Sequence, residues 1–170
     1  MLKSKCSLFG EHFSFIWRIY MHDLFITDFD NLVFQRAFKT YFAELGVNVS
    51  CWGDLWEEMN RGNNVAFLKV DENQKAVGLI QCQIIESKSW FFKEHYGFIR
   101  EFWVRKDCRN MGYGTQLLTL AEQYFLDNEV GQSILTTDSA EKFYLKHGYK
   151  KRTDIAAKNN DAVFVKMLQE

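Results

Sequence analysis

The chain has 170 residues, of which 47% are hydrophobic and 25% are charged, and its formal net charge at pH 7 is −1. This length and composition suit a globular protein with one core, so we expect a single domain over residues 1–170. The small net charge argues against binding to nucleic acid or to an anionic membrane, because both partners select strongly basic surfaces.

In the first third of the chain, the apolar spacing predicts one strand and two helices. Apolar side chains alternate over residues 12–20, which indicates a strand. They recur at helical spacing over residues 28–45, where Asp28 or Asp30 can cap the first turn. The same spacing recurs over residues 50–61, and a glycine follows each helix, as is common after a last turn.

The rest of the chain alternates between strands and helices. Residues 65–70 and 76–86 predict a hairpin of two strands, and residues 87–95 are expected to form a loop. Asp138 and Glu141 have the spacing of a capping box at the start of the last helix. The later elements are expected at 98–104 (strand), 113–127 (helix), 133–137 (strand), 139–147 (helix), 149–153 (strand) and 162–168 (strand).

This order, β-α-α-β-β-β-α-β-α-β-β, predicts the α+β class with one central, mainly antiparallel sheet. The strands at 98–104 and 133–137 are expected to be parallel, because a helix connects them. No repeat or linker divides the chain.

The four cysteines and the N-terminal segment bear on location and metal binding. Cys6, Cys51, Cys82 and Cys108 lie far apart, which gives neither a metal-binding spacing nor a dense disulfide framework. The N-terminal segment lacks the apolar region of a signal peptide, and no run is long enough to span a bilayer. We therefore expect a cytoplasmic protein that needs no metal and no membrane.

The 98–104 strand is followed by a glycine-containing turn, and the turn by a helix. Such a helix start can bind a phosphate, because its first N–H groups are unpaired and glycines let a ligand approach closely. Arg109 adds a positive charge before Gly112 and Gly114, although a plain turn with two glycines remains an alternative. A P-loop is excluded because no lysine follows Gly114, and a dinucleotide fingerprint because Leu117 replaces its third glycine.

A second motif strengthens the interpretation of the first. Ala140, Phe143, Tyr144, Gly148 and Tyr149 recur at the spacing of the later motif of the GNAT superfamily of N-acetyltransferases. The chain resembles this family closely over about residues 98–150. The resemblance implies a central mixed, mainly antiparallel sheet flanked by helices, in which two splayed parallel strands form the acetyl-CoA cleft.

The resemblance also implies a binding site for acetyl-CoA, the cosubstrate. Backbone groups of the central strand would bind the pantetheine arm, and the N–H groups of the glycine turn would bind the pyrophosphate. Arg105 and Lys106 either add positive charge there or are ordinary solvated residues. Substitution of Gly112 by valine is expected to remove binding with little loss of fold. The expected binding residues are Phe102, Trp103, Val104, Arg109, Asn110, Met111, Gly112, Tyr113, Gly114 and Thr115.

Two residues are the candidate catalytic groups. Tyr144 matches the family position of the general acid that protonates the leaving CoA thiolate, and the alternative is a purely structural role. Glu101 is expected on the same strand face as Ile99 and Trp103, where an apolar setting can raise the pKa of a carboxyl and make it a base. Glu101 can equally be part of a salt bridge, for instance with an arginine across a homodimer.

Other bases and the acceptor remain open at this level. His22 and His95, both expected in loops, are alternative bases, and so is a chain of water molecules. The resemblance implies that segments 20–31, 46–62 and 87–97 form the acceptor pocket. Their aromatic and acidic side chains suit a small cationic amine. These side chains are Phe25, Phe29, Trp52, Trp90, Phe91, Asp23, Asp28, Asp30, Glu57 and Glu58.

The expected function is therefore an acetyl-CoA-dependent N-acetyltransferase. It would transfer an acetyl group to a primary amine of a small molecule or a peptide by direct attack. The alternative is a non-catalytic acyl-CoA-binding regulatory module on the same scaffold.

Overall fold

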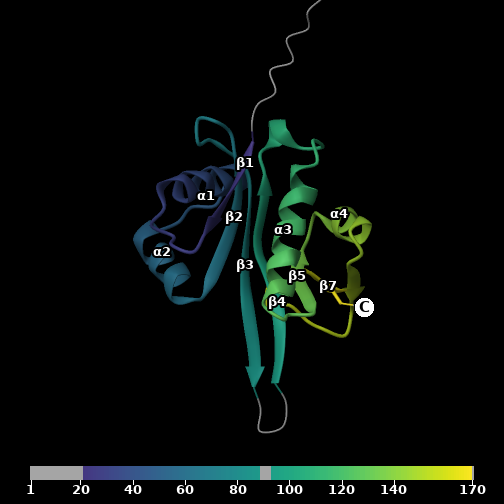
Figure 1. Cartoon of the computed structure of the whole chain (residues 1–170). Helices are drawn as coiled ribbons and strands as arrows, with labels where there is room; N and C mark the ends of the chain where they lie inside the picture. The colour runs from purple at the N-terminus through teal and green to yellow at the C-terminus, as the bar shows by residue number, and fades with distance from the viewer. Residues whose placement is uncertain (1–20, 89–92, 170) are drawn as a thin grey trace, which may run out of the picture.

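The computed structural model describes residues 21–88 and 93–169 of the chain, which form one seven-stranded sheet with helices on both faces (Figure 1). The strand predicted at 12–20 and the side chains of Trp90 and Phe91 lie outside the described residues. The strands are β1 (His22–Ile26), β2 (Asn64–Val70), β3 (Ala76–Lys88), β4 (Lys93–Val104), β5 (Gln132–Thr137), β6 (Lys150–Arg152) and β7 (Ala162–Met167). The helices are α1 (Leu32–Leu45), α2 (Trp52–Arg61), α3 (Tyr113–Asp127) and α4 (Glu141–Lys146), with a 3-10 turn at Lys106–Cys108.

The sheet has the order β1-β2-β3-β4-β5-β7-β6 and confirms the predicted fold class. Every neighbouring pair is antiparallel except β4 and β5, which are parallel as expected. The parallel pairing runs only from Gly97 with Ser133 to Ile99 with Leu135. Beyond these pairs both strands continue without bonding to each other, so the sheet opens there.

A β-bulge in β4 decides which way its side chains point. Ile99 pairs with Cys82 of β3, and Glu101 pairs with the preceding residue, Gln81, so Arg100 is an extra residue without a partner. Successive residues of β3 point to opposite faces, and therefore Ile99 and Glu101 do too. The expectation that these two residues share a face is wrong, because the bulge interrupts the alternation.

Two hydrophobic cores lie on the two faces of the sheet. Helices α1 and α2 cover one face, and α3 covers the other, with α4 beside it (Figure 1). Aromatic side chains of α1 and α2 pack against β2, β3 and β4 in the first core, which includes Phe34, Phe38, Trp56, Leu68, Leu79 and Trp103. Helix α3 contributes most of the second core, which includes Leu117, Leu118, Ala121, Phe125, Ile80 and Cys82.

Two predicted caps are replaced by other side chains. Helix α1 is capped by Asn31, whose Oδ1 accepts bonds from the N–H groups of Val33 and Phe34 at 2.9 and 3.1 Å. At the start of α4, Thr137 Oγ1 accepts from the Ala140 N–H at 3.0 Å, and no capping box forms. The pattern located both helix starts but not the side chain that caps them.

The loop expected at 87–95 is largely strand. Strand β3 extends to Lys88 and β4 begins at Lys93, so the two strands form a hairpin that extends beyond the rest of the sheet (Figure 1). The prediction underestimated the strands because polar residues in this exposed hairpin hide the alternation. Among the helices of the described residues, none combines the length and apolar character that a membrane span needs.

Candidate active site

A cleft of about 1130 Å³ opens where β4 and β5 separate. The C-terminal end of α1, the N-terminal turn of α3 and helix α4 contribute to its walls. Met111 and Tyr113 are not among its lining residues, and the Met111 side chain is exposed. The other expected acetyl-CoA residues all line it, namely Phe102, Trp103, Val104, Arg109, Asn110, Gly112, Gly114 and Thr115.

The N-terminal turn of α3 is open toward this cleft. Its N-cap residue is Gly112, so no side chain caps the first N–H groups, and no acidic residue lies in the first turn. These N–H groups and the helix dipole favour an anion. Gly112 has a φ of +84°, which strains any other residue. A Gly112→Val variant would therefore also lose stability, which corrects the expectation of little loss of fold.

Arg109 lies at the same end of the cleft. Its Nε donates a hydrogen bond to the carbonyl of Val104 at 2.9 Å, which ties the turn to the end of β4. Its terminal nitrogen lies 3.8 Å from a carboxylate oxygen of Glu44 in α1, a distance at which the two charges attract. Arg109 therefore connects α1, β4 and the glycine turn.

The two other basic residues of this region differ in orientation. Lys106 lines the cleft, in agreement with a role near an anion. Arg105 does not line it, because its guanidinium binds Asp107 at 2.6 Å and the carbonyl of Ala76 at 3.2 Å. Arg105 therefore fits neither alternative: it does not line the cleft, and its side chain is only 19% exposed and bonded within the protein.

His147 is a cleft residue that the sequence did not indicate. Its Nδ1 lies 2.8 Å from the carbonyl of Phe143, which can only accept, so Nδ1 carries the proton in neutral His147. Its Nε2 then accepts from the hydroxyl of Thr115 at 2.9 Å. This side chain joins the end of α4 to the first turn of α3. Its position directly before Gly148 in the second motif was the one available signal.

Tyr144 of α4 is buried against β4, β7 and its own helix, with only 4% of its surface exposed. Its ring packs against Phe102, Phe143, Tyr149 and Phe164. Its hydroxyl has no hydrogen-bond partner within the described part of the chain, although the residue lines the cleft. Burial raises the pKa of Tyr144, so the hydroxyl stays protonated at neutral pH and can donate.

Glu101 of β4 lines the same cleft as Tyr144 and accepts a hydrogen bond from a residue of α1. The hydroxyl of Tyr41 donates to Glu101 Oε2 at 2.8 Å. Burial raises the pKa of Glu101, while the Tyr41 hydrogen bond and the charge of Arg100 oppose that rise. Arg100 itself binds Glu58 of the same chain at 2.9 Å, so Glu101 does not need an arginine from a dimer partner. Tyr41 was expected only as part of the apolar stripe of α1.

The two histidines considered as bases lie in strands and not in loops. His22 is in β1, where its ring lies 3.1 Å from the Gln74 amide, and His95 is in β4, 3.4 Å from Glu86. Neither residue lines the cleft. The expected loop positions are wrong because the first described strand and the long β3–β4 hairpin include these residues.

The segments expected to form the acceptor pocket lie outside this cleft. None of the described residues in 20–31, 46–62 and 87–97 lines it. Part of its polar lining outside the expected CoA residues comes from α1, from the residues after β5 and from the segment before β7. These residues are Tyr41, Glu44, Asp138, Ser139, Asn159 and Asp161, and further polar lining residues are Arg100, Glu101, Lys106, Thr136, Thr137, Lys146 and His147. Most of the residues expected to bind acetyl-CoA thus line the cleft, and the segments expected to form the acceptor pocket do not.

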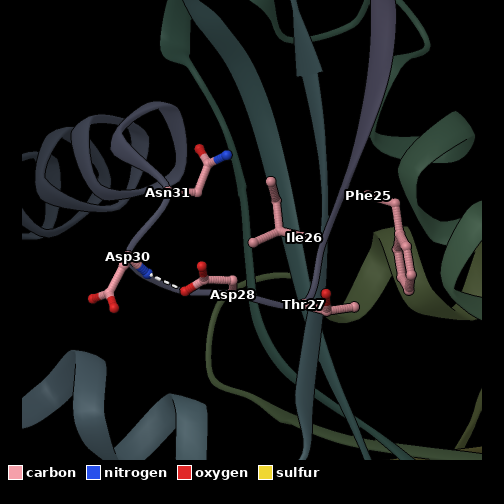
Figure 2. Close-up of a pocket in the computed structure, with 6 residues that line it drawn as sticks. All are labelled: Phe25, Ile26, Thr27, Asp28, Asp30 and Asn31. Atoms are coloured by element: carbon pink, nitrogen blue, oxygen red, sulfur yellow. Dashed lines mark hydrogen bonds between the residues drawn. The ribbon is translucent and has the colours of Figure 1, made fainter.

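A smaller hollow of about 260 Å³ lies where β1 leads into α1. Figure 2 shows Asp28 and Asp30 beside it, with the Asp30 N–H bonded to Asp28 Oδ1 at 2.9 Å, and shows Phe25 pointing away from them. The predicted acceptor segment 20–31 thus contributes to this hollow. Its carboxylates shape the turn before α1.

Within residues 21–88 and 93–169, no three histidine, cysteine or acidic side chains gather as metal ligands would.

Comparison with known proteins agrees with this geometry. Residues 19–149 match the model of the acetyltransferase (GNAT) family, which is well over half of the chain. A comparison with curated proteins finds no match.

Solved structures share the fold at low sequence identity. A GNAT-family acetyltransferase from Staphylococcus aureus Mu50 has a TM-score of 0.65 and 15% identity, covering 88% of this chain and 100% of that one. The NatC complex bound to Gag peptide and CoA has a TM-score of 0.66 and 16% identity, covering 88% of this chain and 99% of that one. A third structure is an aminoglycoside acetyltransferase from an uncultured soil metagenomic sample, in complex with sisomicin. It has a TM-score of 0.58 and 17% identity, covering 75% of this chain and 84% of that one.

A sheet that opens at its one parallel pair, beside an uncapped helix start, is the architecture of an acetyltransferase. The chain belongs to the GNAT family of acetyltransferases.

Proposed function

We propose that this protein is an acetyl-CoA-dependent N-acetyltransferase that acylates a primary amine of a small molecule or peptide by direct attack. The observation that carries the proposal is the cleft, which brings the open turn of α3, the hydroxyl of Tyr144 and the carboxylate of Glu101 to one place. Each of the three offers a function that acetyl transfer needs, which are an anion site, an acid and a base.

The residues present fit acetyl-CoA. The uncapped first turn of α3, with Gly112 at positive φ, would bind the pyrophosphate, and Arg109 and Lys106 would add positive charge. The edge of β4 beyond Ile99 carries no ladder pairs with β5 and offers backbone groups to the pantetheine arm. When bound, the cosubstrate supplies an acetyl thioester. The NatC structure, which has the same fold, contains CoA.

The two proton transfers of the reaction would involve Glu101 and Tyr144, which both line the cleft. Glu101, with a pKa raised by burial, would accept the proton that the ammonium group of the acceptor must lose before it can attack. Tyr144, protonated at neutral pH, would donate its proton to the leaving thiolate. The free hydroxyl of Tyr144 supports this role, because no structural partner has to be released first.

The acceptor is proposed to be a cationic amine. Glu44, Glu101, Asp138 and Asp161 line the cleft, and Asp138 and Asp161 have no salt bridge within the described residues. These carboxylates attract a protonated amine, while the basic residues Arg100, Lys106, Arg109 and Lys146 line other parts of the same cleft. The neighbours named for sisomicin and for a Gag peptide are compatible with either a small molecule or a peptide.

Turnover of acetyl-CoA with a panel of polyamines, aminoglycosides and peptide N termini tests the proposal. We expect release of free CoA thiol that depends on the amine, together with an acetylated product seen by mass spectrometry. Binding of acetyl-CoA without any turnover would instead favour the non-catalytic acyl-CoA-binding module. A chelator in the assay should leave the rate unchanged.

Location and assembly are proposals of the same kind. The free thiols Cys51, Cys82 and Cys108 support a reducing compartment such as the cytoplasm, which cell fractionation would test. A homodimer stays a prediction that light scattering would test.

A further inference from the structure

One buried polar side chain has no part in the chemistry described so far. The side chain of Gln81, in β3, is completely buried, with an exposed fraction of 0%. Neither its Nε2 nor its Oε1 has a hydrogen-bond partner among residues 21–88 and 93–169. Buried polar groups nearly always have partners, and an unpaired amide lowers stability. The surroundings of Gln81 therefore need an explanation.

The sheet register places Gln81 directly opposite Glu101 of β4. Side chains at opposite positions of antiparallel strands leave the same face, with Cβ atoms about 4.5–5.5 Å apart. On its other side Gln81 faces Ala66 of β2, whose methyl group cannot pair with an amide. The polar neighbour that strand pairing supplies to Gln81 is thus Glu101, the proposed base.

One oxygen of the Glu101 carboxylate is available to this neighbour. Oε2 accepts the hydroxyl of Tyr41, whereas Oε1 has no hydrogen bond within the described ranges. The Gln81 amide forms no direct bond to it, so a bridging group has to be small. A water molecule suits this position, because it can accept from the amide and donate to the carboxylate.

The groups around Glu101 act on its pKa in both directions. Burial raises the pKa of Glu101, and the Tyr41 hydroxyl and the Arg100 charge lower it. A further hydrogen-bond donor on the Gln81 side would also lower the pKa of Glu101, because it stabilises the ionised carboxylate. The charged or titratable groups facing this region are Tyr41 and Glu44 of α1, Glu58 of α2, Arg100 of β4 and Tyr144 of α4.

We propose that Gln81 is a positioning residue for the base: its amide holds one water molecule that donates a hydrogen bond to Oε1 of Glu101. This proposal rests on the proposed function, in which Glu101 accepts the proton of the amine. The bridging water favours the ionised form of Glu101 and holds its carboxylate in place between β3 and α1. Gln81 acts through Glu101 and touches neither substrate.

The substitution Gln81→Met tests this, because it removes the amide and keeps a similar length and volume. We expect the pKa of Glu101, measured by ¹³C NMR on the protein without substrates, to rise by about one unit. The acid limb of the kcat/KM profile should move to higher pH by the same amount. The thermal midpoint should stay the same or fall slightly, because the amide loses its hydrogen bond to the water while methionine fills a similar volume.

The substitution Gln83→Met is the matched control on the same strand and the same face. Gln83 donates its amide to the carbonyl of Gly62 and is paired with Asn64, not with Glu101. We expect its loss to lower the thermal midpoint and to leave the pKa of Glu101 unchanged. Only Gln81→Met is therefore expected to shift the pKa of Glu101.

An unchanged Glu101 pKa in folded Gln81→Met overturns the proposal. If Gln81→Met does not fold, a high-resolution crystal structure of the unaltered protein decides the question. A water between Gln81 and Glu101 supports the proposal, and a direct partner or an unhydrated amide overturns it. If no amine is acetylated but the pKa shifts, the proposed function fails while the link between Gln81 and Glu101 stands.

Discussion

The first turns of α1 and α3 both have backbone N–H groups without a partner in the helix, but only those of α1 are capped by a side chain. In α1 the side chain of Asn31 accepts two of these N–H groups, so the protein satisfies its own helix start. In α3 the corresponding residue is Gly112, which has no side chain to offer. In α1 the cap is part of the fold, whereas the open start of α3 leaves its N–H groups available to a ligand in the cleft.

Two tyrosines of the second motif show the same contrast. The hydroxyl of Tyr149 donates to Ser133 Oγ at 2.8 Å, and both residues are buried. The hydroxyl of Tyr144 has no partner in the described residues and lines the cleft. Two buried tyrosines close together in sequence thus differ in whether the protein already uses their hydroxyl.

The largest effect is expected from removing the free hydroxyl. Tyr144→Phe should lower kcat by roughly 10²-fold, the scale of lost acid catalysis. Acetyl-CoA affinity and unfolding should change little, because no partner loses a bond. Steady-state kinetics, calorimetry and urea unfolding measure the three quantities. Turnover equal to that of the unaltered protein would show that Tyr144 is only a core residue.

The opposite pattern is expected from the paired hydroxyl. Tyr149→Phe should reduce the free energy of unfolding by about 1–3 kcal/mol, because Ser133 is left buried and unpaired. Its kcat should stay close to that of the unaltered protein. Urea unfolding with kinetics below the transition checks both, and a rate loss without a stability loss would contradict the comparison.

Substitution of the first residue of α1 and of α3 by glutamate tests whether the two helix starts differ in anion binding. Tyr113→Glu should weaken CoA binding roughly tenfold, because a negative charge then lies near the proposed pyrophosphate site. Leu32→Glu, at the same position of α1, should leave CoA binding unchanged. Both should keep or slightly raise stability through the helix dipole.

Titration calorimetry at two salt concentrations measures this difference, since added salt should reduce the Tyr113→Glu effect. Tyr113→Gln is its control, because it removes the ring without adding charge. Equal losses of affinity in Tyr113→Glu and Tyr113→Gln would show that packing, and not charge, is responsible.

The smallest effect is expected from removing the cap of α1. Asn31→Ala should reduce the free energy of unfolding by about 1 kcal/mol, the usual loss for a helix cap. CoA affinity should not change, since Asn31 does not line the cleft. Urea unfolding and calorimetry check the two parts, and a change of CoA affinity would contradict the separation of the two helix starts.

Local patterns in the sequence were sufficient for most elements and for much of the lining of the cleft. Helix α3 was predicted at its observed bounds, because apolar spacing and the glycine turn are signals within one segment. The parallel pairing of β4 with β5 also followed from the helix between them. Eight of the ten expected acetyl-CoA residues line the cleft, since the motif that carries them is continuous in sequence.

Only the tertiary structure decided the faces and partners of the acid–base groups. The bulge at Arg100 depends on the register between β3 and β4, and it moves Glu101 to the face opposite Ile99. The contact between Tyr41 and Glu101 joins residues 60 positions apart. Periodicity describes one element at a time, so it contains neither a register shift nor a contact between elements. For the same reason, periodicity did not show that Gln81 lies opposite Glu101.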